Sequence, residues 1–198
     1  MSFRRTHIPF RSQIKVVFWV VAIITAIEIV NLLSGRTLNA FGLIPREVGG
    51  LVGVATAPFL HGSLIHYFSN IVPLSIFSLL LLQHGVVRFS LVTFVIIVLS
   101  GLLVWAFGRT AIHVGASGLI YGYFGYLLVA GWVSREIKLL AISVFVAIGY
   151  GGMIWGVLPG MPFISWEFHL FGFSAGVLAG VKWGREKKEE NPKCSEKC

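Results

Sequence analysis

The segment that decides the fold reads KVVFWVVAIITAIEIVNLLSGR and runs from Lys15 to Arg36. Between its basic ends the only charged side chain is Glu28, and the segment is long enough to cross about 30 Å of hydrocarbon as a helix. It has no small-residue cleavage site, so we interpret it as a membrane anchor rather than a signal peptide. A charge inside a span costs about 2.5 to 3.5 kcal/mol. Glu28 is therefore expected to be protonated or hydrogen-bonded within a bundle.

The composition extends this interpretation to the rest of the chain. Of 198 residues, 56% are hydrophobic and only 12% are charged, which is too apolar for a water-soluble globule. Five further apolar stretches bounded by glycine, proline or charge lie at roughly 64–82, 89–108, 117–132, 137–156 and 166–183. The sequence therefore predicts an all-α, polytopic membrane bundle of six transmembrane helices. Residues 1–14 precede this 15–183 domain, and 184–198 form a polar tail.

The basic residues predict the orientation. The formal charge of +8 does not indicate a nucleic-acid partner, because the basic residues lie at the ends of apolar runs. Six spans place both termini on one side, and 13 of the 16 lysines and arginines then fall on that side; Arg36, Arg46 and Arg109 fall on the other. By the positive-inside rule, both termini are expected in the cytoplasm.

Two spans are expected to be short. Ser117 to Arg135 and Glu167 to Lys182 give only about 22 to 27 Å of helix. Non-helical backbone at membrane depth is tolerated only when it is buried in protein or lines a water-filled cavity. The loops around Gly115 and Pro162 therefore predict a wet cavity that opens outward.

Four polar residues lie near the outer ends of the even-numbered spans, namely His66, Asn70, Ser117 and His169. Polar residues inside spans are expensive and often functional. This set fits acyl transfer, in which a hydroxyl nucleophile needs an imidazole to take its proton. The free amide of Ser117 at a helix N-terminus, with Asn70 and His66, would supply donors for the oxyanion.

Small residues favour a close contact between the helices that carry Ser117 and His169. Gly172, Gly176 and Gly180 recur every four residues, and Gly118 and Gly122 repeat that spacing. Such stripes let helix backbones approach closely in membranes. Alone, they predict packing only.

Three motifs occur in order on these spans. They are G-A-S-G at Gly115 to Gly118 followed by Tyr121, H-x-x-x-x-H-x-x-x-N at His61, His66 and Asn70, and His169 followed by G-x-x-x-G. Together they resemble the rhomboid intramembrane serine proteases over roughly residues 15–183. Two departures are the absence of a Trp-Arg pair from the first loop and the presence of Phe168 where alanine is common.

The resemblance implies a rhomboid-like fold and a set of roles. Ser117 would be the nucleophile and His169 the general base, in a dyad without an acid that suits a chain with no aspartate. His66, Asn70 and the Ser117 amide would form the oxyanion hole, and Tyr121 would pack beside His169. Gly115, Gly118 and His61 would support the site, while the fifth span and the loop before the sixth would act as gate and cap.

The resemblance also implies a substrate and a location. The substrate would be a transmembrane segment of another membrane protein, cut near its extracytoplasmic end without a cofactor or metal. The enzyme would lie in the lipid bilayer of a bacterial inner membrane, with its active site open to the outer side. The particular substrate, the cleavage motif, the pathway and the oligomeric state do not follow from the sequence.

Other functions remain open at this point. A catalytically silent relative that binds membrane clients would have the same fold, and a small transporter or redox carrier would also be apolar. Four outer histidines, His61, His66, His113 and His169, raise the question of a metal or haem, but His61 and His66 are five apart rather than four. His7 and His84 are interpreted as surface residues. Cys194 and Cys198 lie in the tail and are assigned no role.

Overall fold

The computed structural model describes residues 8–160 and 164–184. Seven α-helices occur in these ranges: α1 (Phe10–Leu33), α2 (Gly53–Thr56), α3 (Leu64–Leu82), α4 (Val86–Phe107), α5 (Ser117–Ser134), α6 (Ile137–Tyr150) and α7 (Trp166–Trp183). Short 3-10 segments lie at Thr37–Phe41, Gly49–Val52, Ala57–Phe59 and Gly151–Val157. The described residues contain no strand, only an isolated bridge between Leu43 and His113.

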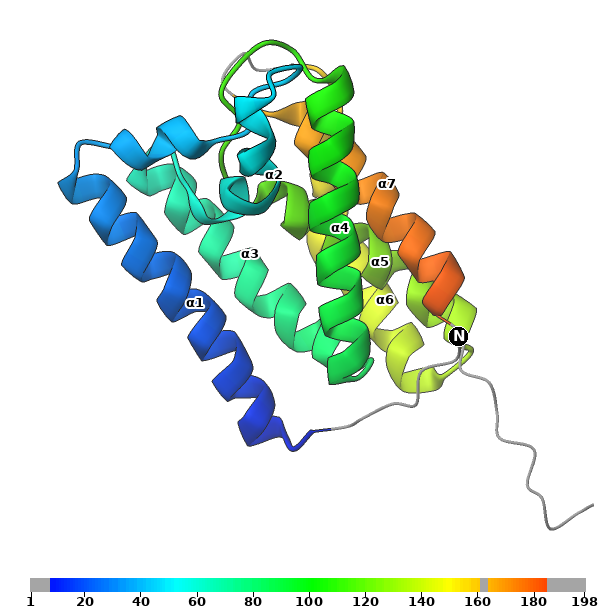
Figure 1. Cartoon of the computed structure of the whole chain (residues 1–198). Helices are drawn as coiled ribbons and strands as arrows, with labels where there is room; N and C mark the ends of the chain where they lie inside the picture. The colour runs from blue at the N-terminus through cyan, green and yellow to red at the C-terminus, as the bar shows by residue number, and fades with distance from the viewer. Residues whose placement is uncertain (1–7, 161–163, 185–198) are drawn as a thin grey trace, which may run out of the picture.

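The six long helices form one bundle (Figure 1). α1 begins and α7 ends at the same end of the bundle, and the short helices of the first loop lie at the opposite end (Figure 1). Within residues 8–160 and 164–184, four segments are long and apolar enough to cross a membrane: Phe10–Leu33, Leu64–Leu82, Val86–Phe107 and Ile137–Val157. α5 and α7 are not among the four. The all-helical membrane fold is confirmed, and six long helices occur among the described residues, but by length and composition only four segments qualify as spans, so the predicted count of six transmembrane helices is not confirmed.

The backbones of α5 and α7 touch. A Cβ atom at Gly172 would lie 2.1 Å from the carbonyl oxygen of Gly118, and one at Gly176 would lie 1.8 Å from that of Gly122. Only a hydrogen atom fits in such a contact, so glycine is required at both positions of α7. This contact fixes the helix that begins with Ser117 against the helix that carries His169.

Several boundaries differ from the sequence-based prediction. α1 begins at Phe10, five residues before Lys15, and α4 begins at Val86 rather than at 89. α6 ends at Tyr150, and the chain continues to Val157 as a tighter 3-10 helix. This change follows the pair Gly151 and Gly152, whose backbone freedom weakens a regular helix.

His84 was wrongly interpreted as a surface residue. Its side chain is 1% exposed, and its ring lies edge-on to Tyr126 with the ring centroids 5.2 Å apart. The reason is the short turn between α3 and α4, which brings His84 against α5. The other sequence-based interpretations that concern His7, Pro162 and the tail with Cys194 and Cys198 lie outside the described residues.

Candidate active site

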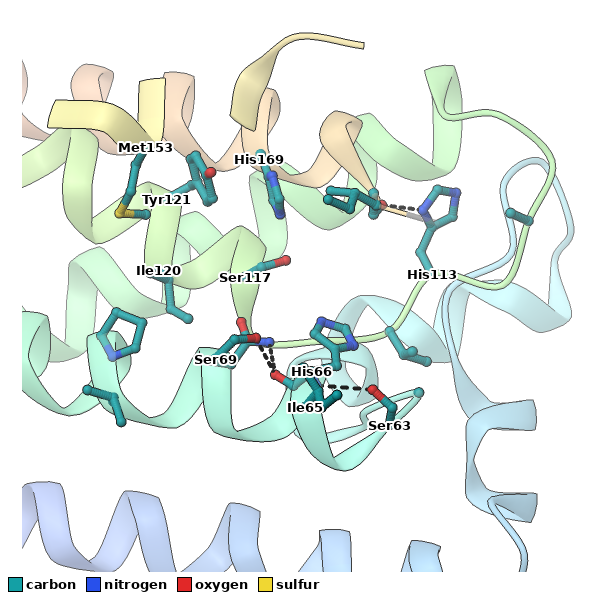
Figure 2. Close-up of a pocket in the computed structure, with 18 of the residues that line it drawn as sticks. Ser63, Ile65, His66, Ser69, His113, Ser117, Ile120, Tyr121, Met153 and His169 are labelled. Carbon is teal, nitrogen blue, oxygen red and sulfur yellow. Dashed lines mark hydrogen bonds between the residues drawn. The ribbon is translucent and has the colours of Figure 1, made fainter. Parts of the chain in front are cut away.

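A cavity of about 930 Å³ lies between α3, α5, α7 and the loops that precede them. Its lining includes His66, Asn70, Ser117, Tyr121 and His169, so the fold brings these five sequence-predicted residues to one space (Figure 2). The remaining wall is mainly apolar and comes from α3, from the loop 109–114 before α5, from the end of α6 and the segment after it, and from the residues just before α7. A polar set in an apolar cavity is the usual composition of a binding or catalytic site.

The beginning of α3 is fixed by a side-chain cap. Ser63 has an extended backbone, and its hydroxyl oxygen accepts a hydrogen bond from the His66 amide at 3.1 Å. One turn further on, the side-chain amide of Asn70 donates a hydrogen bond to the backbone carbonyl of His66 at 2.7 Å. Asn70 is 4% exposed. Because this amide carries two N–H groups, a second donor remains for the cavity.

The His66 ring lies directly against Gly115. Gly115 has a φ of +123°, which favours glycine, and a Cβ atom there would lie 2.6 Å from Nε2 of His66. The Gly115 amide donates to the Ala57 carbonyl at 2.9 Å, which ties this turn to the first loop. Glycine at this position therefore permits both the turn that precedes Ser117 and the approach of the His66 ring.

Ser117 is the first residue of α5 and is half-buried. Its amide lies in the first turn, where the helix offers no acceptor, and the helix dipole is positive there. The side chain points into the space between His169 and His66 (Figure 2). Within the described residues, the Ser117 hydroxyl makes no hydrogen bond.

His169 is held in one orientation by two contacts. Its Nδ1–H donates to the carbonyl of Gly156 at 2.9 Å, and its ring stacks on Tyr121 with centroids 4.0 Å apart and planes 8° apart. Since a neutral imidazole has one N–H, the bond to Gly156 leaves Nε2 as an acceptor. The ring is 8% exposed and faces the same space as Ser117 (Figure 2).

An ion pair joins the loop before α5 to the start of α7. Nε of Arg109 lies 3.2 Å from a carboxylate oxygen of Glu167, and the Arg109 amide donates to the same oxygen at 3.3 Å. The Arg109 guanidinium also donates to the Ile164 carbonyl. The Glu167 carboxylate is buried, and a buried charge is costly unless it is paired. Arg109 provides that partner.

His113 adds a second tie beside this ion pair. Its Nε2–H donates to the Arg109 carbonyl at 3.0 Å, so Nδ1 accepts from the Ser165 hydroxyl. Burial lowers the pKa of His113 below its usual value, which keeps the ring neutral. These contacts hold the two segments that deliver Ser117 and His169 at a fixed separation.

Two residues singled out in the sequence, His61 and Phe168, lie beside the cavity rather than in its lining. His61 does not line the cavity; it is 1% exposed and lies behind His66, with the two ring centroids 5.3 Å apart. Phe168 fills the space over Gly118 and meets His113 edge-on. In the part of the chain that the structure describes, no group of three or more histidine, cysteine or acidic side chains could hold a metal ion.

Sequence reasoning missed several residues that shape the site. The Ser63 cap has a signal, since Ser63 stands three residues before His66 at the start of an apolar run. The Gly156 carbonyl has none, because any residue offers a backbone carbonyl. The Arg109–Glu167 pair joins residues 58 apart, which no local pattern indicates.

Fold and site together define a helical membrane protein with a polar cavity that holds a serine and a histidine. Residues 48–186 match the model of the Rhomboid domain family. The chain belongs to the rhomboid family.

Relatives are found in bacteria and in plants. An uncharacterized protein of Mycobacterium bovis is 36% identical over 168 residues, which is 80% of this chain and 70% of the relative. An uncharacterized protein of Mycobacterium leprae is 32% identical over 169 residues, covering 80% and 66%. RHOMBOID-like protein 1 of Arabidopsis thaliana is 28% identical over 148 residues, covering 70% of this chain and 37% of the plant protein.

Proposed function

We propose that this protein is an intramembrane serine endopeptidase that cuts transmembrane segments of other membrane proteins near their extracytoplasmic end. The observation that carries the proposal is the His169 imidazole, whose Nδ1–H is committed to Gly156 and whose ring faces the same cavity as Ser117. A neutral imidazole with a free Nε2 is what a serine nucleophile needs as its base.

The reaction would proceed in two halves. Oγ of Ser117 attacks the carbonyl carbon of the scissile peptide bond, and its proton moves to Nε2 of His169. The oxyanion that forms is stabilised by the Ser117 amide, the Asn70 amide and the His66 ring. Collapse breaks the C–N bond, and His169 gives the proton to the leaving amine. Water then hydrolyses the acyl-enzyme with His169 again acting as base.

The cavity walls fit a substrate segment with apolar side chains. Ile65, Val72 and Met153 line the cavity together with the polar set, so an unwound stretch of a transmembrane segment would meet apolar side chains in the cavity that holds Ser117. We place the protein in a bacterial inner membrane, with the cavity on the extracytoplasmic side and no cofactor in the reaction.

A second candidate is a client-binding protein that does not cut. The absence of a hydrogen bond on the Ser117 hydroxyl within the described residues favours it, because an activated serine is usually bonded to its base. Catalytic hydrogen bonds are, however, often long in ligand-free enzymes and tighten with substrate. The serine and the histidine are both present, which favours the protease.

A fluorophosphonate probe separates these two functions without knowledge of the substrate. The detergent-purified wild type is expected to be labelled at one serine, and Ser117→Ala and His169→Ala are expected to lose the label while remaining folded. Mass spectrometry of the labelled peptide identifies the residue. A folded wild type that takes no label, or a label that persists in Ser117→Ala, would favour the client-binding function.

A further inference from the structure

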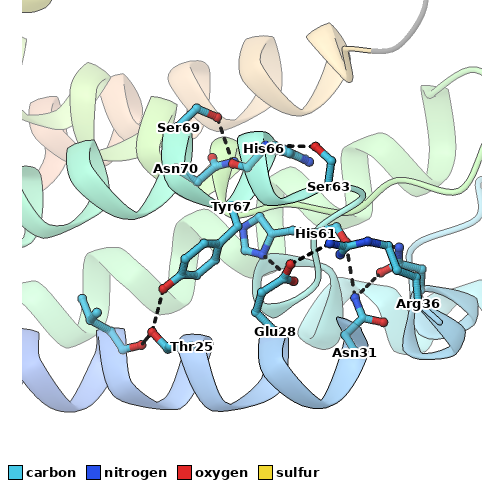
Figure 3. Close-up of polar contacts among 12 residues, drawn as sticks. Thr25, Glu28, Asn31, Arg36, His61, Ser63, His66, Tyr67, Ser69 and Asn70 are labelled. Carbon is cyan, nitrogen blue, oxygen red and sulfur yellow. Dashed lines mark hydrogen bonds and ion pairs between the residues drawn. The ribbon is translucent and has the colours of Figure 1, made fainter. Parts of the chain in front are cut away.

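A buried polar cluster lies directly behind His66 and joins α1 to the start of α3 (Figure 3). We call Glu28, Asn31, Arg36, Asn39 and His61 the Glu28 cluster. Glu28 is 3% exposed, Asn31 is fully buried and His61 is 1% exposed. The match to the family begins at residue 48, so four of these five residues lie outside the matched region.

Arg36 compensates the charge of Glu28. A guanidinium nitrogen lies 3.0 Å from one oxygen of the Glu28 carboxylate, and Nδ1 of His61 lies 3.8 Å from the other. Burial, together with the nearby His66 and Arg36, lowers the pKa of His61 to about 4, so the His61 ring is neutral at pH 7. The carboxylate expected to be protonated or hydrogen-bonded is therefore held by an ion pair.

The backbone of His61 is pinned by three donors. Its carbonyl oxygen accepts hydrogen bonds from Arg36 at 2.5 Å, from Asn39 at 3.2 Å and from Asn31 at 3.3 Å. The Asn31 amide also donates to the side-chain oxygen of Asn39 at 2.9 Å. A carbonyl oxygen has two lone pairs. Three donors are therefore more than are needed to satisfy the hydrogen-bonding capacity of the His61 carbonyl.

The His61 ring transmits this restraint to His66. The two rings meet edge-on at 77° with centroids 5.3 Å apart, and the His66 ring also lies against Gly115, where a Cβ atom would come within 2.6 Å of its Nε2. An oxyanion donor acts only when it lies about 2.7 to 3.1 Å from the oxyanion. A His66 ring that tilts would lose this distance.

We propose that Glu28 and Arg36 are positioning residues that hold the His66 imidazole, through His61, in the orientation that an oxyanion donor requires. The inference rests on the proposed function, because it assigns His66 that role. A buried ion pair is weak evidence for stability, since well-packed apolar residues often replace one without loss. The cluster instead has the features expected of a network that fixes the position of His61, namely three donors on its carbonyl and an ion pair beside it.

A neighbouring contact provides the matched control. The hydroxyl groups of Thr25 and Tyr67 are hydrogen-bonded at 2.7 Å, and this bond also joins α1 to α3. Thr25 lies one turn before Glu28 and takes no part in the ion pair or in the bonds to the His61 carbonyl. Thr25→Val therefore removes a hydrogen bond between the same two helices and keeps the ion pair, the bonds to the His61 carbonyl and the Tyr67 ring that meets His61 edge-on.

The test is the rate of fluorophosphonate labelling at Ser117. Removal of one oxyanion donor lowers the rate about 100- to 1000-fold. A donor that is only displaced still contributes part of this rate enhancement, so Glu28→Gln is expected to slow labelling roughly ten-fold. Thr25→Val is expected to label at the wild-type rate. In a His66→Ala background, Glu28→Gln is expected to have no further effect, because the cluster acts through His66.

Arg36→Lys guards against a Glu28→Gln protein that fails to fold. It keeps the charge, yet a lysine lacks the fork that reaches the Glu28 carboxylate and the His61 carbonyl together, and the same slower labelling is expected. Equal slowing in the wild-type and His66→Ala backgrounds, or wild-type rates in Arg36→Lys, overturns the inference.

Histidine NMR distinguishes failure of the inference from failure of the proposed function. With ¹³C,¹⁵N-labelled histidine, the His66 signals are assigned by their loss in His66→Ala. They are expected to shift in Arg36→Lys and not in Thr25→Val. Shifted His66 signals in Arg36→Lys, in a protein that takes no label, would support the positioning inference and contradict the proposed protease function. Unshifted signals in a protein that does take the label would contradict the positioning inference and support the protease function.

Discussion

At the scale of single residues, the orientation of His169 is the feature on which the proposed chemistry depends. The Gly156 carbonyl selects the tautomer, and the face of Tyr121 fixes the plane of the ring. Neither contact involves a charge, which suits a site where no aspartate is available. Backbone and aromatic contacts would thus take over the orienting role that a carboxylate has in a serine triad.

Tyr121 allows this point to be tested. Tyr121→Phe keeps the ring that stacks on His169, so it is expected to label with a fluorophosphonate within about two-fold of the wild-type rate, whereas Tyr121→Ala is expected to label about ten-fold more slowly because a small misplacement of a base is costly. Circular dichroism confirms that both variants fold. Equal rates for the two variants would show that the stacking does not position His169.

The sequence pointed to the candidate catalytic residues more directly than to the groups that orient them. Ser117, His169, His66 and Asn70 could be chosen because polar side chains are rare inside apolar spans. His61 was expected only to support the site; its ring lies behind the cavity, and its contacts depend on Glu28 and Arg36, which come from a different part of the chain. Partners that meet only through the fold leave no periodic signal.

At the scale of helices, the contact of α5 with α7 sets the separation of Ser117 from His169. The glycine spacing was readable in the sequence, and the structure shows backbone against backbone at Gly172 and Gly176. The change from α6 to a 3-10 helix at Gly151 was not predicted, although it brings Gly156 to His169. Hydrophobic periodicity cannot distinguish these two kinds of helix in a uniformly apolar segment.

A single methyl group should disrupt this contact. Gly176→Ala would place a Cβ atom 1.8 Å from the Gly122 carbonyl oxygen, and overpacking of this kind typically costs about 1 to 3 kcal/mol of unfolding free energy. Lower thermal stability and loss of fluorophosphonate labelling are expected. Gly149→Ala in α6 is the control, because nothing lies within 4 Å of its Cβ position. Wild-type stability in Gly176→Ala would contradict the close contact.

At the scale of the whole molecule, the arrangement in the membrane follows from charge and from the even number of long helices. The structure places the start of α1 and the end of α7 at one end of the bundle (Figure 1), and the cluster of basic residues predicts that this end is cytoplasmic. The candidate site would then face outward. Side and depth in the bilayer were predicted from sequence alone.

The two cysteines of the sequence, Cys194 and Cys198, report on this orientation. A membrane-impermeant maleimide is expected to label inverted inner-membrane vesicles and to leave intact spheroplasts unlabelled, because the tail is predicted to be cytoplasmic. A variant with both cysteines replaced by serine gives the background. Labelling of intact spheroplasts would place the tail, and with it the whole topology, on the opposite side.

The most direct measurement of the central claim compares the protein termini in membranes that contain the wild type with those in membranes that contain Ser117→Ala. Mass spectrometry of new N-termini is expected to find cuts within transmembrane segments, near their outer ends, in the wild-type membranes only. Identical termini in the two membranes, together with intact membrane proteins that co-purify with both forms, would contradict proteolysis and leave a protein that binds its clients without cutting them.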